Sequence, residues 1–527
     1  MDSTRYELRR QAIVENCAPT PGVPATVEVP LGRVKSVLLR DDQSVVQGRG
    51  TDPVAEKYAR ERIAHWDKVA ETMGLKRGAS KHYYHLLAQI YKFLIPPGQR
   101  VLEVGCGTGD LLAAVKPSFG VGIDFSNVMI HYAKERHPEL RFAQVDAHEL
   151  SKDGEMFDAI ILSDLLNDVW DVQRLLEQVA AVSHPGTRVI INIYSRLWEL
   201  PLSGAVRLGL AKPKLRQNWL TVDDVANLLN LAGFELIRSW QEIMFPARIP
   251  IISQLFNRFV VKLWPFKHLA LTNFIVARPK PHSGQTSSDS RVSVIIPARN
   301  EAGNIREIFE RTPEMNGGTE LIFVEGHSKD DTFATIEHAM REFPHRDTKL
   351  LRQTGVGKGD AVRLGFANAS GAILMILDAD LTVPPEDLPR FSEAIRSGNA
   401  EFVNGVRLVY PMEAQAMRFF NFLGNKFFSL AFSWLLGQNI KDTLCGTKVI
   451  RRSDYEKIAA NRSYFGDFDP FGDFDLIFGA AKLNLKILDM PIRYRERTYG
   501  TTNIQRWRHG VLLLRMVLFA ASKIKFI

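Results

Sequence analysis

The chain has 527 residues, more than one hydrophobic core usually holds, so at least two domains are expected. Its 67 basic and 59 acidic residues leave a net charge of +8, and a content of 45% hydrophobic and 24% charged residues is ordinary for globular proteins. This mild basic excess suits phosphate-rich ligands or anionic lipid, but it also suits solubility alone. The cysteines, Cys17, Cys106 and Cys445, lie far apart without a CxxC pair, which argues against a disulfide framework or a zinc site.

The N-terminal sequence and the lengths of the apolar runs indicate the cellular location of the protein. The N-terminal sequence MDSTRYELRRQAIVENC carries charges throughout and has no apolar core, which argues against a secretory signal. No stretch of 18 consecutive apolar residues occurs, so no simple membrane span is predicted. We expect a cytoplasmic protein.

A change of composition near residues 280–290 predicts a linker, because a strand-like LTNFIVARP gives way there to Pro, Ser, Gly and Thr. On both sides, short Val/Ile/Leu runs alternate with longer helical patterns, which predicts an α/β fold with a parallel sheet in each half. We expect an N-terminal arm at 1–50, a first domain at 51–279, a second at 291–510 and a basic amphipathic C-terminal helix at 511–527.

The first half contains a ligand-binding pattern in chain order. In RVLEVGCGTGDLL, a predicted strand runs into Gly105 and Gly107 ahead of a helix, so the backbone can approach a ligand at the helix N-terminus. The next strand, GVGIDFS, ends on Asp124, 19 residues after Gly105, where a carboxylate can bind a ribose diol. A third element, RFAQVDAHEL, ends on Asp146, beside the expected adenine position.

The glycines stand at every second position, with Glu103 just upstream, unlike the G-x-G-x-x-G turn that opens onto a pyrophosphate. The stretch from about 80 to 195 resembles the class I S-adenosylmethionine-dependent methyltransferases, through LEVGCGTG, GIDFS, VDAHEL, FDAIILSDLLNDVWD and HPGTRVIINIY. The resemblance implies a Rossmann-like domain with S-adenosyl-L-methionine as cofactor and these cofactor-binding residues: Glu103, Gly105, Gly107, Asp124, Asp146 and Ala147. Of these, it places Gly105 and Gly107 at the amino-acid end of the cofactor, Asp124 at the ribose, and Asp146 with Ala147 at the adenine. A domain that keeps this fold only as a non-catalytic scaffold is the alternative.

Asp164, Asn167 and Asp168 follow the strand AIIL on the side where such domains hold the methyl acceptor. Carboxylates there could position an acceptor or act as a base. They could equally form a helix-capping cluster, and the two interpretations remain open.

The second half places polar residues after successive buried strands, at the edge where open α/β sheets bind ligands. In VSVIIPARNEAGNI and ELIFVEGHSKDDT these residues are Pro297, Arg299, Asn300, Glu301 and Glu325. GVGKGDAVRLGF adds Lys358 between glycines ahead of a helix; the motif lacks the features of a Walker loop, yet a lysine there suits a phosphate.

The strand LMILDADL ends on two acids, Asp378 and Asp380, separated by one residue. Both carboxylates point to roughly the same side, so their repulsion requires a cation or hydrogen-bond donors between them. Mg²⁺ or Mn²⁺ suits such hard oxygens and commonly carries a nucleotide diphosphate. An isolated D-x-D also arises by chance.

From about 291 to 505 the chain resembles the family-two glycosyltransferases of GT-A fold, through VIIPARNEAGNI, FVEGHSKDDT, GKGDAVRLGF, LDADL and DTLCGTKVIRRSDY. More narrowly it is similar to the dolichol-phosphate and polyprenyl-phosphate mannose or glucose synthases, through FGDFDLIFGAAK and MPIRYRERTYGTTNI. The resemblance implies a UDP- or GDP-linked sugar donor, with its base and ribose at Pro297, Arg299, Asn300, Glu301 and Glu325, and its metal-bound diphosphate at Asp378 and Asp380. EGHSKDD departs from the family, which commonly has consecutive acids and Gly-Ser at this point.

Basic residues gather near the C-terminus, at Arg493, Arg495, Arg497, Arg506, Arg508, Arg515, Lys523 and Lys525. Arginine binds phosphate oxygens with two parallel hydrogen bonds, and Arg497 in RTYGTT matches a position that the lipid-phosphate-using members employ. We therefore expect an inverting, metal-dependent transfer to a polyprenyl phosphate or related glycan acceptor. A phosphate nucleophile needs no base, whereas a hydroxyl acceptor would make Asp475 in GDFDLIF the catalytic base.

Two helical patterns favour peripheral contact with the cytoplasmic face of the inner or plasma membrane. The first, at 416–436, is apolar except for a narrow stripe of Asn421, Asn425, Ser429 and Ser433, which is typical of a buried or interfacial helix. The second, RHGVLLLRMVLFAASKIKFI, resembles a basic interfacial helix. No nucleic-acid recognition motif occurs, so no nucleic-acid partner is expected.

Overall fold

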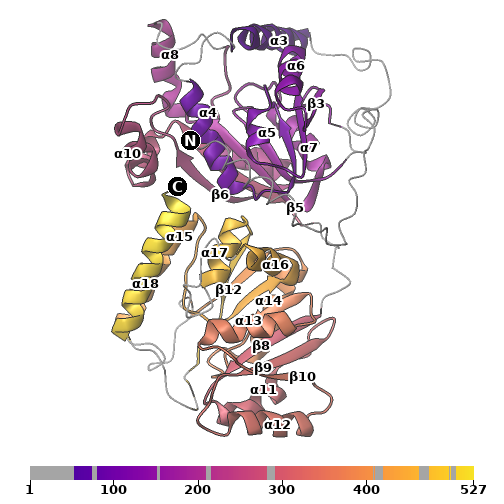
Figure 1. Cartoon of the computed structure of the whole chain (residues 1–527), viewed down its shortest axis with the longest axis vertical. Coiled ribbons are helices and arrows are strands. Elements are labelled where there is room, and N and C mark those ends of the chain that lie inside the picture. The colour runs from indigo at the N-terminus through magenta and orange to yellow at the C-terminus, as the bar shows by residue number, and fades with distance from the viewer. Residues whose placement is uncertain are drawn as a thin grey trace, which may run out of the picture.

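The computed structural model consists of two α/β domains stacked along the long axis of the molecule (Figure 1). It describes residues 53–73, 80–150, 155–208, 215–281, 291–407, 409, 419–461, 474–495, 497, 499 and 506–526. The predicted N-terminal arm at 1–50 and most of the predicted linker at 280–290 lie outside these residues.

The first domain is built on a seven-stranded sheet with the order β3-β2-β1-β4-β5-β7-β6. All neighbours are parallel except β7, which runs antiparallel to both β5 and β6. The strands are β1 (Arg100–Val104), β2 (Phe119–Asp124), β3 (Arg141–Gln144), β4 (Phe157–Ser163), β5 (Ser183–Tyr194), β6 (Phe234–Glu242) and β7 (Thr272–Pro279). Successive residues of a strand enter different cores, Leu102 on one face and Val101 on the other, which explains the continuous apolar runs.

Helices cover both faces of this sheet (Figure 1). They are α3 (Pro53–Met73), α4 (Ser80–Leu94), α5 (Asp110–Ala114), α6 (Asn127–Arg136), α7 (Val172–Ala181), α8 (Glu199–Arg207), α9 (Val222–Leu231) and α10 (Ile252–Arg258), with the 3₁₀ turns η1 (Arg196–Trp198), η2 (Val260–Lys262) and η3 (Phe266–Leu269). Side chains cap three of them, since Ser126, Asp171 and Thr221 accept hydrogen bonds from backbone N–H groups in the first turns of α6, α7 and α9.

The second domain also has a seven-stranded sheet, with the order β10-β9-β8-β11-β13-β12-β14. β13 runs antiparallel to β11 and β12, and the other pairs are parallel. The strands are β8 (Val292–Ala298), β9 (Thr319–Glu325), β10 (Asp347–Arg352), β11 (Ile373–Ile376), β12 (Phe402–Val406), β13 (Lys448–Arg451) and β14 (Ile487–Pro491). Ile295 and Val294 again face two separate cores, so this sheet too is covered on both faces.

The helices of the second domain are α11 (Ile305–Arg311), α12 (Thr332–Glu342), α13 (Lys358–Asn368), α14 (Leu388–Arg396), α15 (Phe419–Leu436), α16 (Arg452–Ala460), α17 (Phe474–Lys482) and α18 (Arg506–Ala520), with the short turns η4 (Ala302–Asn304), η5 (Pro385–Asp387) and the π-helical η7 (Ala521–Lys525). The last two helical segments show that the predicted C-terminal helix starts earlier than residue 511. Among the helices described, none is long and apolar enough to cross a membrane. The predicted fold class, α/β twice over, is confirmed.

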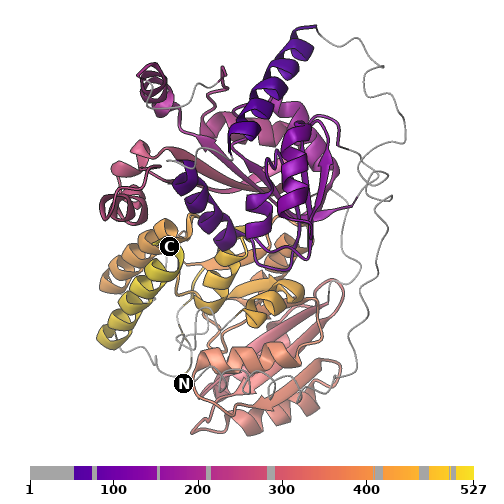
Figure 2. The ribbon, with the colours of Figure 1, turned by 45° about the horizontal axis from the view of Figure 1, so that its top comes forward.

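Helix α15 buries apolar side chains (Phe428, Phe432, Leu435 and Leu436) in the core together with its polar stripe. Its polar stripe faces inward: Asn425 is 2% exposed and donates to Asp442, and Ser429 donates to the Ile440 carbonyl. Its outward face exposes Phe427 and Leu430, the latter 72% exposed, next to an exposed Lys426. α18 packs side by side with α15 (Figure 2). Its apolar residues Val511, Leu514 and Leu518 are exposed.

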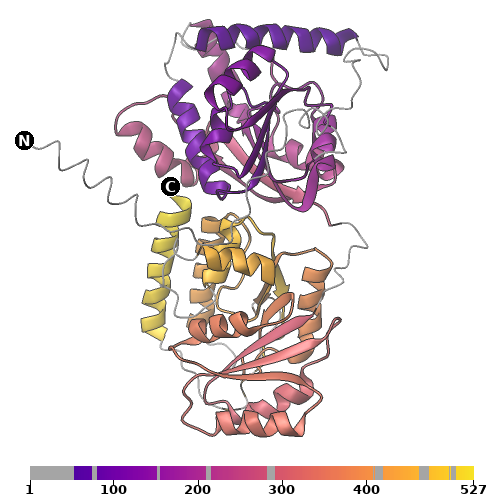
Figure 3. The same ribbon diagram turned by 45° about the vertical axis from the view of Figure 1, so that its right-hand side comes forward.

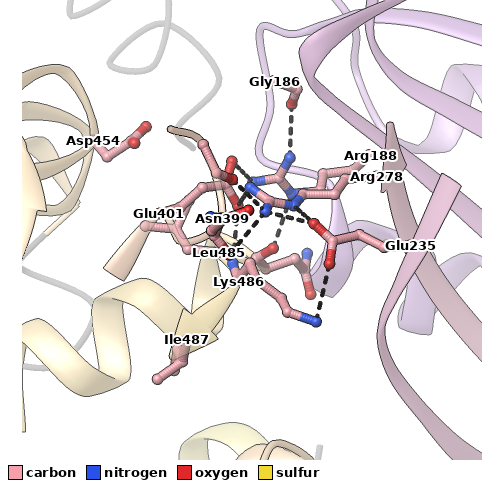
Figure 4. A network of polar contacts seen from close by, with 12 residues as sticks. Gly186, Arg188, Glu235, Arg278, Asn399, Glu401, Asp454, Leu485, Lys486 and Ile487 are labelled. Atoms are coloured by element: carbon pink, nitrogen blue, oxygen red, sulfur yellow. Dashed lines mark hydrogen bonds and ion pairs between the residues drawn. The ribbon is translucent and has the colours of Figure 1, made fainter. Parts of the chain in front are cut away.

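A buried polar network joins the two domains (Figure 4). Arg188 of β5 donates from Nη2 to both carboxylate oxygens of Glu401, at 2.8 and 2.7 Å, and Arg278 of β7 reaches the same carboxylate at 3.3 Å. Asn484, just before β14, donates to the Leu94 carbonyl at 3.1 Å and accepts from Arg238 at 2.6 Å. We call this contact the seam.

Candidate functional sites

The first candidate site lies at the carboxyl edge of the first sheet, where β1, β2, β3 and β4 end. Gly105 and Gly107 follow β1 with φ of +73° and +50°, a region that glycine adopts without strain. The Gly107 N–H donates to one oxygen of Asp124 at 2.9 Å, and the Ser126 N–H donates to the other at 2.9 Å. A Cβ on Gly105 would collide with Leu165, whereas one on Gly107 would point into open space. The turn therefore presents Gly107 to an open volume beside Asp124.

Two acids at this site are buried. Burial raises the pKa of Glu103 well above its ordinary value, and one of its oxygens, Oε2, has no hydrogen-bond partner among the described residues. Burial also raises the pKa of Asp124, despite the backbone N–H groups that it accepts. Buried carboxylates disfavour an anionic ligand and favour a cationic one. S-adenosyl-L-methionine carries an ammonium and a sulfonium, so the residues present fit this cofactor better than a pyrophosphate.

The third expected contact, Asp146, is organised by a histidine that we did not predict. Asp146 Oδ1 accepts from the backbone N–H of His148 at 2.9 Å and lies 2.7 Å from its Nδ1. Burial alone would raise the pKa of Asp146, but these hydrogen bonds hold it below its ordinary value. His148 also accepts from the Asp171 N–H at 3.3 Å, which ties the loop after β3 to α7. Ala147 packs against the core beside it.

Asp164 lies at the centre of a cluster of polar groups, whereas Asn167 and Asp168 serve the fold. Asp164 accepts from Tyr83 at 3.0 Å, from Asn192 at 2.6 Å and from Tyr194 at 3.3 Å, and it has a positive φ of 53°. Such strain in a non-glycine residue is often found at functional sites. The alternative of a helix-capping cluster is wrong, because Asp171 caps α7.

The two neighbours of Asp164 hold other segments in place. Asp168 pairs with Arg62 at 3.0 Å and accepts from Trp66 at 2.6 Å, which fixes α3, and Asn167 donates to the Asn218 carbonyl at 2.8 Å.

The second candidate site lies at the carboxyl edge of the second sheet, after β8, β9 and β11. Lys358, the first residue of α13, lies 2.6 Å from Asp378. Arg497 lies 2.6 Å from Asp380 and 3.0 Å from Glu301. Each acid of the predicted D-x-D pair is thus paired with a different cation, and the structure brings Arg497 to the donor edge.

Burial and neighbouring charges shift the pKa of two acids at this edge, and the backbone at Gly446 packs tightly against one of them. Burial would raise the pKa of Asp378, but Lys358 holds it below its ordinary value. Burial raises the pKa of Glu301 to about 7, against the opposing effect of Arg497. Gly446, in the loop before β13, leaves no room for a side chain, because a Cβ there would collide with both the Asp378 carboxylate and the Lys358 ammonium.

The remaining predicted donor residues line the same edge. Pro297 belongs to the end of β8, and Arg299, Asn300 and Glu301 follow it, with Arg299 exposed. Asn300 accepts from the Lys329 N–H at 2.7 Å, and Glu325 accepts from the Ser328 N–H at 2.5 Å. Their side chains therefore shape the loop after β9. These turn-forming contacts fall in EGHSKDD, the motif that departs from the family, and they were not predicted from the sequence.

The carboxylate oxygens of Asp378 and Asp380 are donors of the kind that Mg²⁺ and Mn²⁺ prefer, in a number that leaves positions for phosphate and water. The pair therefore fits a metal that a substrate phosphate completes. Among the described residues, no three His, Cys, Asp or Glu side chains come together as a metal site.

The acceptor residues proposed from the sequence have different ion-pair partners. Asp475 on α17 lies 3.7 Å from Arg363 of α13, while Arg497 lies with Asp380. Arg495 is tied to the loop after β11 through its backbone N–H, which donates to the Thr382 carbonyl at 3.0 Å. The side chains of Arg506 and Arg508 lie outside the residues that the structure describes.

Together, the sheet orders and the two edge sites define a Rossmann-like domain joined to a GT-A domain. Residues 79–239 match the family model described as a methyltransferase domain, and residues 293–459 match that of glycosyl transferase family 2. The chain is therefore a fusion of a methyltransferase domain with a family 2 glycosyltransferase domain, as the resemblance predicted.

Individual relatives are similar to parts of the chain. Dolichol-phosphate mannosyltransferase of Pyrococcus furiosus is 32% identical over 220 residues, which cover 41% of this chain and 59% of that protein. The chain thus spans about three fifths of this relative. Glucosyl-3-phosphoglycerate synthase from Mycobacterium tuberculosis, solved with Mn²⁺ and UDP, is 18% identical with a TM-score of 0.35 over 47% of this chain and 86% of its own. Magnesium protoporphyrin IX methyltransferase from Synechocystis is 18% identical with a TM-score of 0.25 over 44% and 90%.

Proposed function

We propose that the protein is a bifunctional enzyme whose second domain transfers a sugar from a UDP- or GDP-linked donor to a polyprenyl phosphate or related glycan acceptor. The observation that carries this proposal is the pairing of Asp378 with Lys358 and of Asp380 with Arg497 at one sheet edge. Two acids and two cations so arranged complement a bound metal diphosphate. Its metal would pair with Asp378 and Asp380, and its phosphates would pair with Lys358 and Arg497.

In the proposed reaction an acceptor phosphate oxygen forms a bond to the anomeric carbon while the bond to the nucleotide diphosphate breaks, with inversion. A divalent ion at Asp378 and Asp380 would stabilise the charge of the departing diphosphate. Lys358 binds the diphosphate, and Arg497 positions the anionic groups of donor and acceptor. The phosphate nucleophile is already ionised near pH 7, so no residue has to remove a proton.

We propose that the first domain transfers a methyl group from S-adenosyl-L-methionine. Gly105, Gly107 and Asp124 hold the cofactor, with Glu103 at its amino-acid end and Asp146 with Ala147 at its adenine. The polar cluster around Asp164 supports an acceptor position opposite the cofactor, because Tyr83 and Asn192 fix the orientation of its carboxylate.

We further propose peripheral contact with the cytoplasmic face of a membrane through α15 and α18. The outward apolar faces of these two helices support it, since a lipid acceptor would be presented at such a surface.

The alternative is a hydroxyl acceptor in surface glycan synthesis, with Asp475 as base and the first domain as a scaffold. The experiment is nucleotide release from UDP- and GDP-sugars with Mg²⁺ or Mn²⁺, with and without a short polyprenyl phosphate, and with Asp380→Ala as control. Release that the lipid stimulates and Asp380→Ala abolishes is expected. Release indifferent to the lipid but lost in Asp475→Asn would overturn the phosphate acceptor.

Calorimetry tests the first domain separately. S-adenosyl-L-methionine should bind the full-length chain and should fail to bind Asp124→Ala. A chain that gives no heat with the cofactor would instead be a scaffold.

A further inference from the structure

The first domain exposes an unusual run of apolar side chains at 249–269, which we call the apolar ridge. It comprises α10, η2 and η3, and Ile251 and Trp264 are 79% and 77% exposed. The other exposed large apolar residues of the ridge are Ile249, Ile252, Leu255, Phe259, Leu263, Phe266 and Leu269. Contiguous apolar surface of this density is rare on soluble proteins and marks a site of interaction with a partner or membrane.

The exposed charges within the ridge are of one sign, and the nearby acid Glu242 is buried in an ion pair with Lys262. Between 243 and 288 the sequence contains no Asp or Glu. Arg248 and Arg258 are exposed at the ridge, and Lys267 is partly exposed. The sequence from 506 to 527, which includes α18, also lacks acids. Apolar side chains flanked by basic residues without acids complement an anionic lipid surface, where basic residues face headgroups and apolar ones enter the acyl boundary.

The ridge is continuous with the outward apolar helices of the second domain. The rings of Phe259 and Phe526 lie 5.2 Å apart, and those of Phe526 and Trp434 lie 5.8 Å apart. Trp434 of α15 also donates to the Lys262 carbonyl at 3.1 Å. Figures 1 and 3 show α10 beyond the C-terminal end of α18, on the same side of the molecule.

We propose that the apolar ridge is a second membrane-binding element, contributed by the methyltransferase domain, and that it docks beside α15 and α18 on a bilayer containing anionic lipid. The part of this proposal that places the ridge beside α15 and α18 on one membrane rests on the membrane contact proposed above for those helices. Lipid binding by the ridge does not depend on which acceptor the glycosyltransferase uses. Both domains would then be held at one lipid surface.

The test uses the full-length chain and vesicles of phosphatidylcholine with or without phosphatidylglycerol, free of polyprenyl phosphate. Hydrogen exchange read by mass spectrometry should show protection of 248–269 on the anionic vesicles. In co-sedimentation, the double variant Ile251→Asp with Trp264→Glu should weaken the partition coefficient about tenfold or more, because it replaces inserted apolar area with charge. Leu231→Asp, on the exposed surface of α9 in the same domain, is the matched control and should leave binding unchanged.

Protection confined to α15 and α18, with 248–269 exchanging equally with and without vesicles, would overturn the proposal. So would a loss of binding in Leu231→Asp equal to that in the double variant. Equal binding to vesicles with and without phosphatidylglycerol would also contradict the proposed preference of the ridge for anionic lipid. Vesicle binding through the ridge together with lipid-independent nucleotide release would refute the phosphate acceptor alone, so the two proposals fail separately.

Discussion

Arg188 and Glu401 stand 213 residues apart in the chain, yet one guanidinium nitrogen of Arg188 donates to both oxygens of the Glu401 carboxylate. Both side chains are buried at the seam. Burial alone would raise the pKa of Glu401, but Arg188 and Arg278 hold it below its ordinary value. The two domains therefore share a buried ion pair at the seam.

Removing the carboxylate charge at this contact should weaken the whole protein. Glu401→Gln leaves the buried guanidinium of Arg188 without its anion, while Arg278 keeps its pairing with Glu235; removing one partner of a buried ion pair typically costs about 3–5 kcal/mol. The free energy of unfolding in urea should fall accordingly, whereas Glu310→Gln, which breaks an exposed helical pair with Arg306, should cost less than about 1 kcal/mol. Equal losses in the two variants would show that the seam contributes no more than a surface pair.

The pH dependence of this contact follows from the lowered pKa of Glu401. Its stabilisation is present above the ordinary pKa of 4.5 and is lost as the pH falls through the lower folded value. The difference in unfolding free energy between the wild type and Glu401→Gln should therefore shrink in acid. A difference that stays constant would contradict the ion pair as its source.

Gly107→Ala should separate cofactor binding from folding. The added methyl meets no protein atom, so the fold should survive at the cost of backbone strain at positive φ, about 1 kcal/mol. It enters the open volume beside Asp124, so the affinity for S-adenosyl-L-methionine should fall about tenfold or more. Calorimetry with a parallel thermal unfolding curve measures both. An unchanged affinity would place the cofactor elsewhere.

Gly446→Ala should abolish nucleotide release while the first domain still binds its cofactor. A methyl group at this position displaces Lys358 and Asp378, the pair that the proposed diphosphate needs. Gly424→Ala on α15 is the matched control, because a methyl there meets no atom within 4 Å. Normal turnover in Gly446→Ala would mean that Asp378 and Lys358 take no part in the reaction.

The raised pKa of Glu301 predicts a pH dependence of stability opposite in sign to that of Glu401. Its folded pKa of about 7 exceeds its ordinary value of 4.5, so the folded state holds the proton more tightly than the unfolded one. The stabilisation that this proton gives is full below 4.5 and is lost as the pH rises through 7. Glu301→Gln keeps the neutral form, so the variant should gain thermal stability over the wild type as the pH rises through this window. A constant difference between them would exclude Glu301 as the titrating group.

The strand edges of both sites could be predicted from sequence because their signals are local. Gly105, Asp124, Asp378 and Asp380 stand directly after apolar runs, and parallel strands bring such positions to one edge. The fold class followed from the same alternation of strands and helices.

Contacts between residues far apart in the chain could not be predicted in the same way, because no local sequence pattern indicates them. Arg497 was expected at the acceptor, but its pairing with Glu301 across 196 residues depends on how the loop after β14 crosses the sheet edge. The stripe of Asn425 and Ser429 showed only that one face of α15 differs from the other. The inward face is stabilised by hydrogen bonds to Ile440 and Asp442 of the following loop and by burial of Phe428 and Phe432.

That inward polar stripe has a practical consequence for handling the protein. Buried amides, hydroxyls and phenylalanines hold α15 in one orientation, so Phe427 and Leu430 stay exposed to water however well the protein folds. In dilute aqueous buffer the exposed side chains have only other copies of the chain to cover them. Preparations without detergent or lipid should therefore self-associate as they are concentrated, and a mild detergent should restore single molecules without altering the fold.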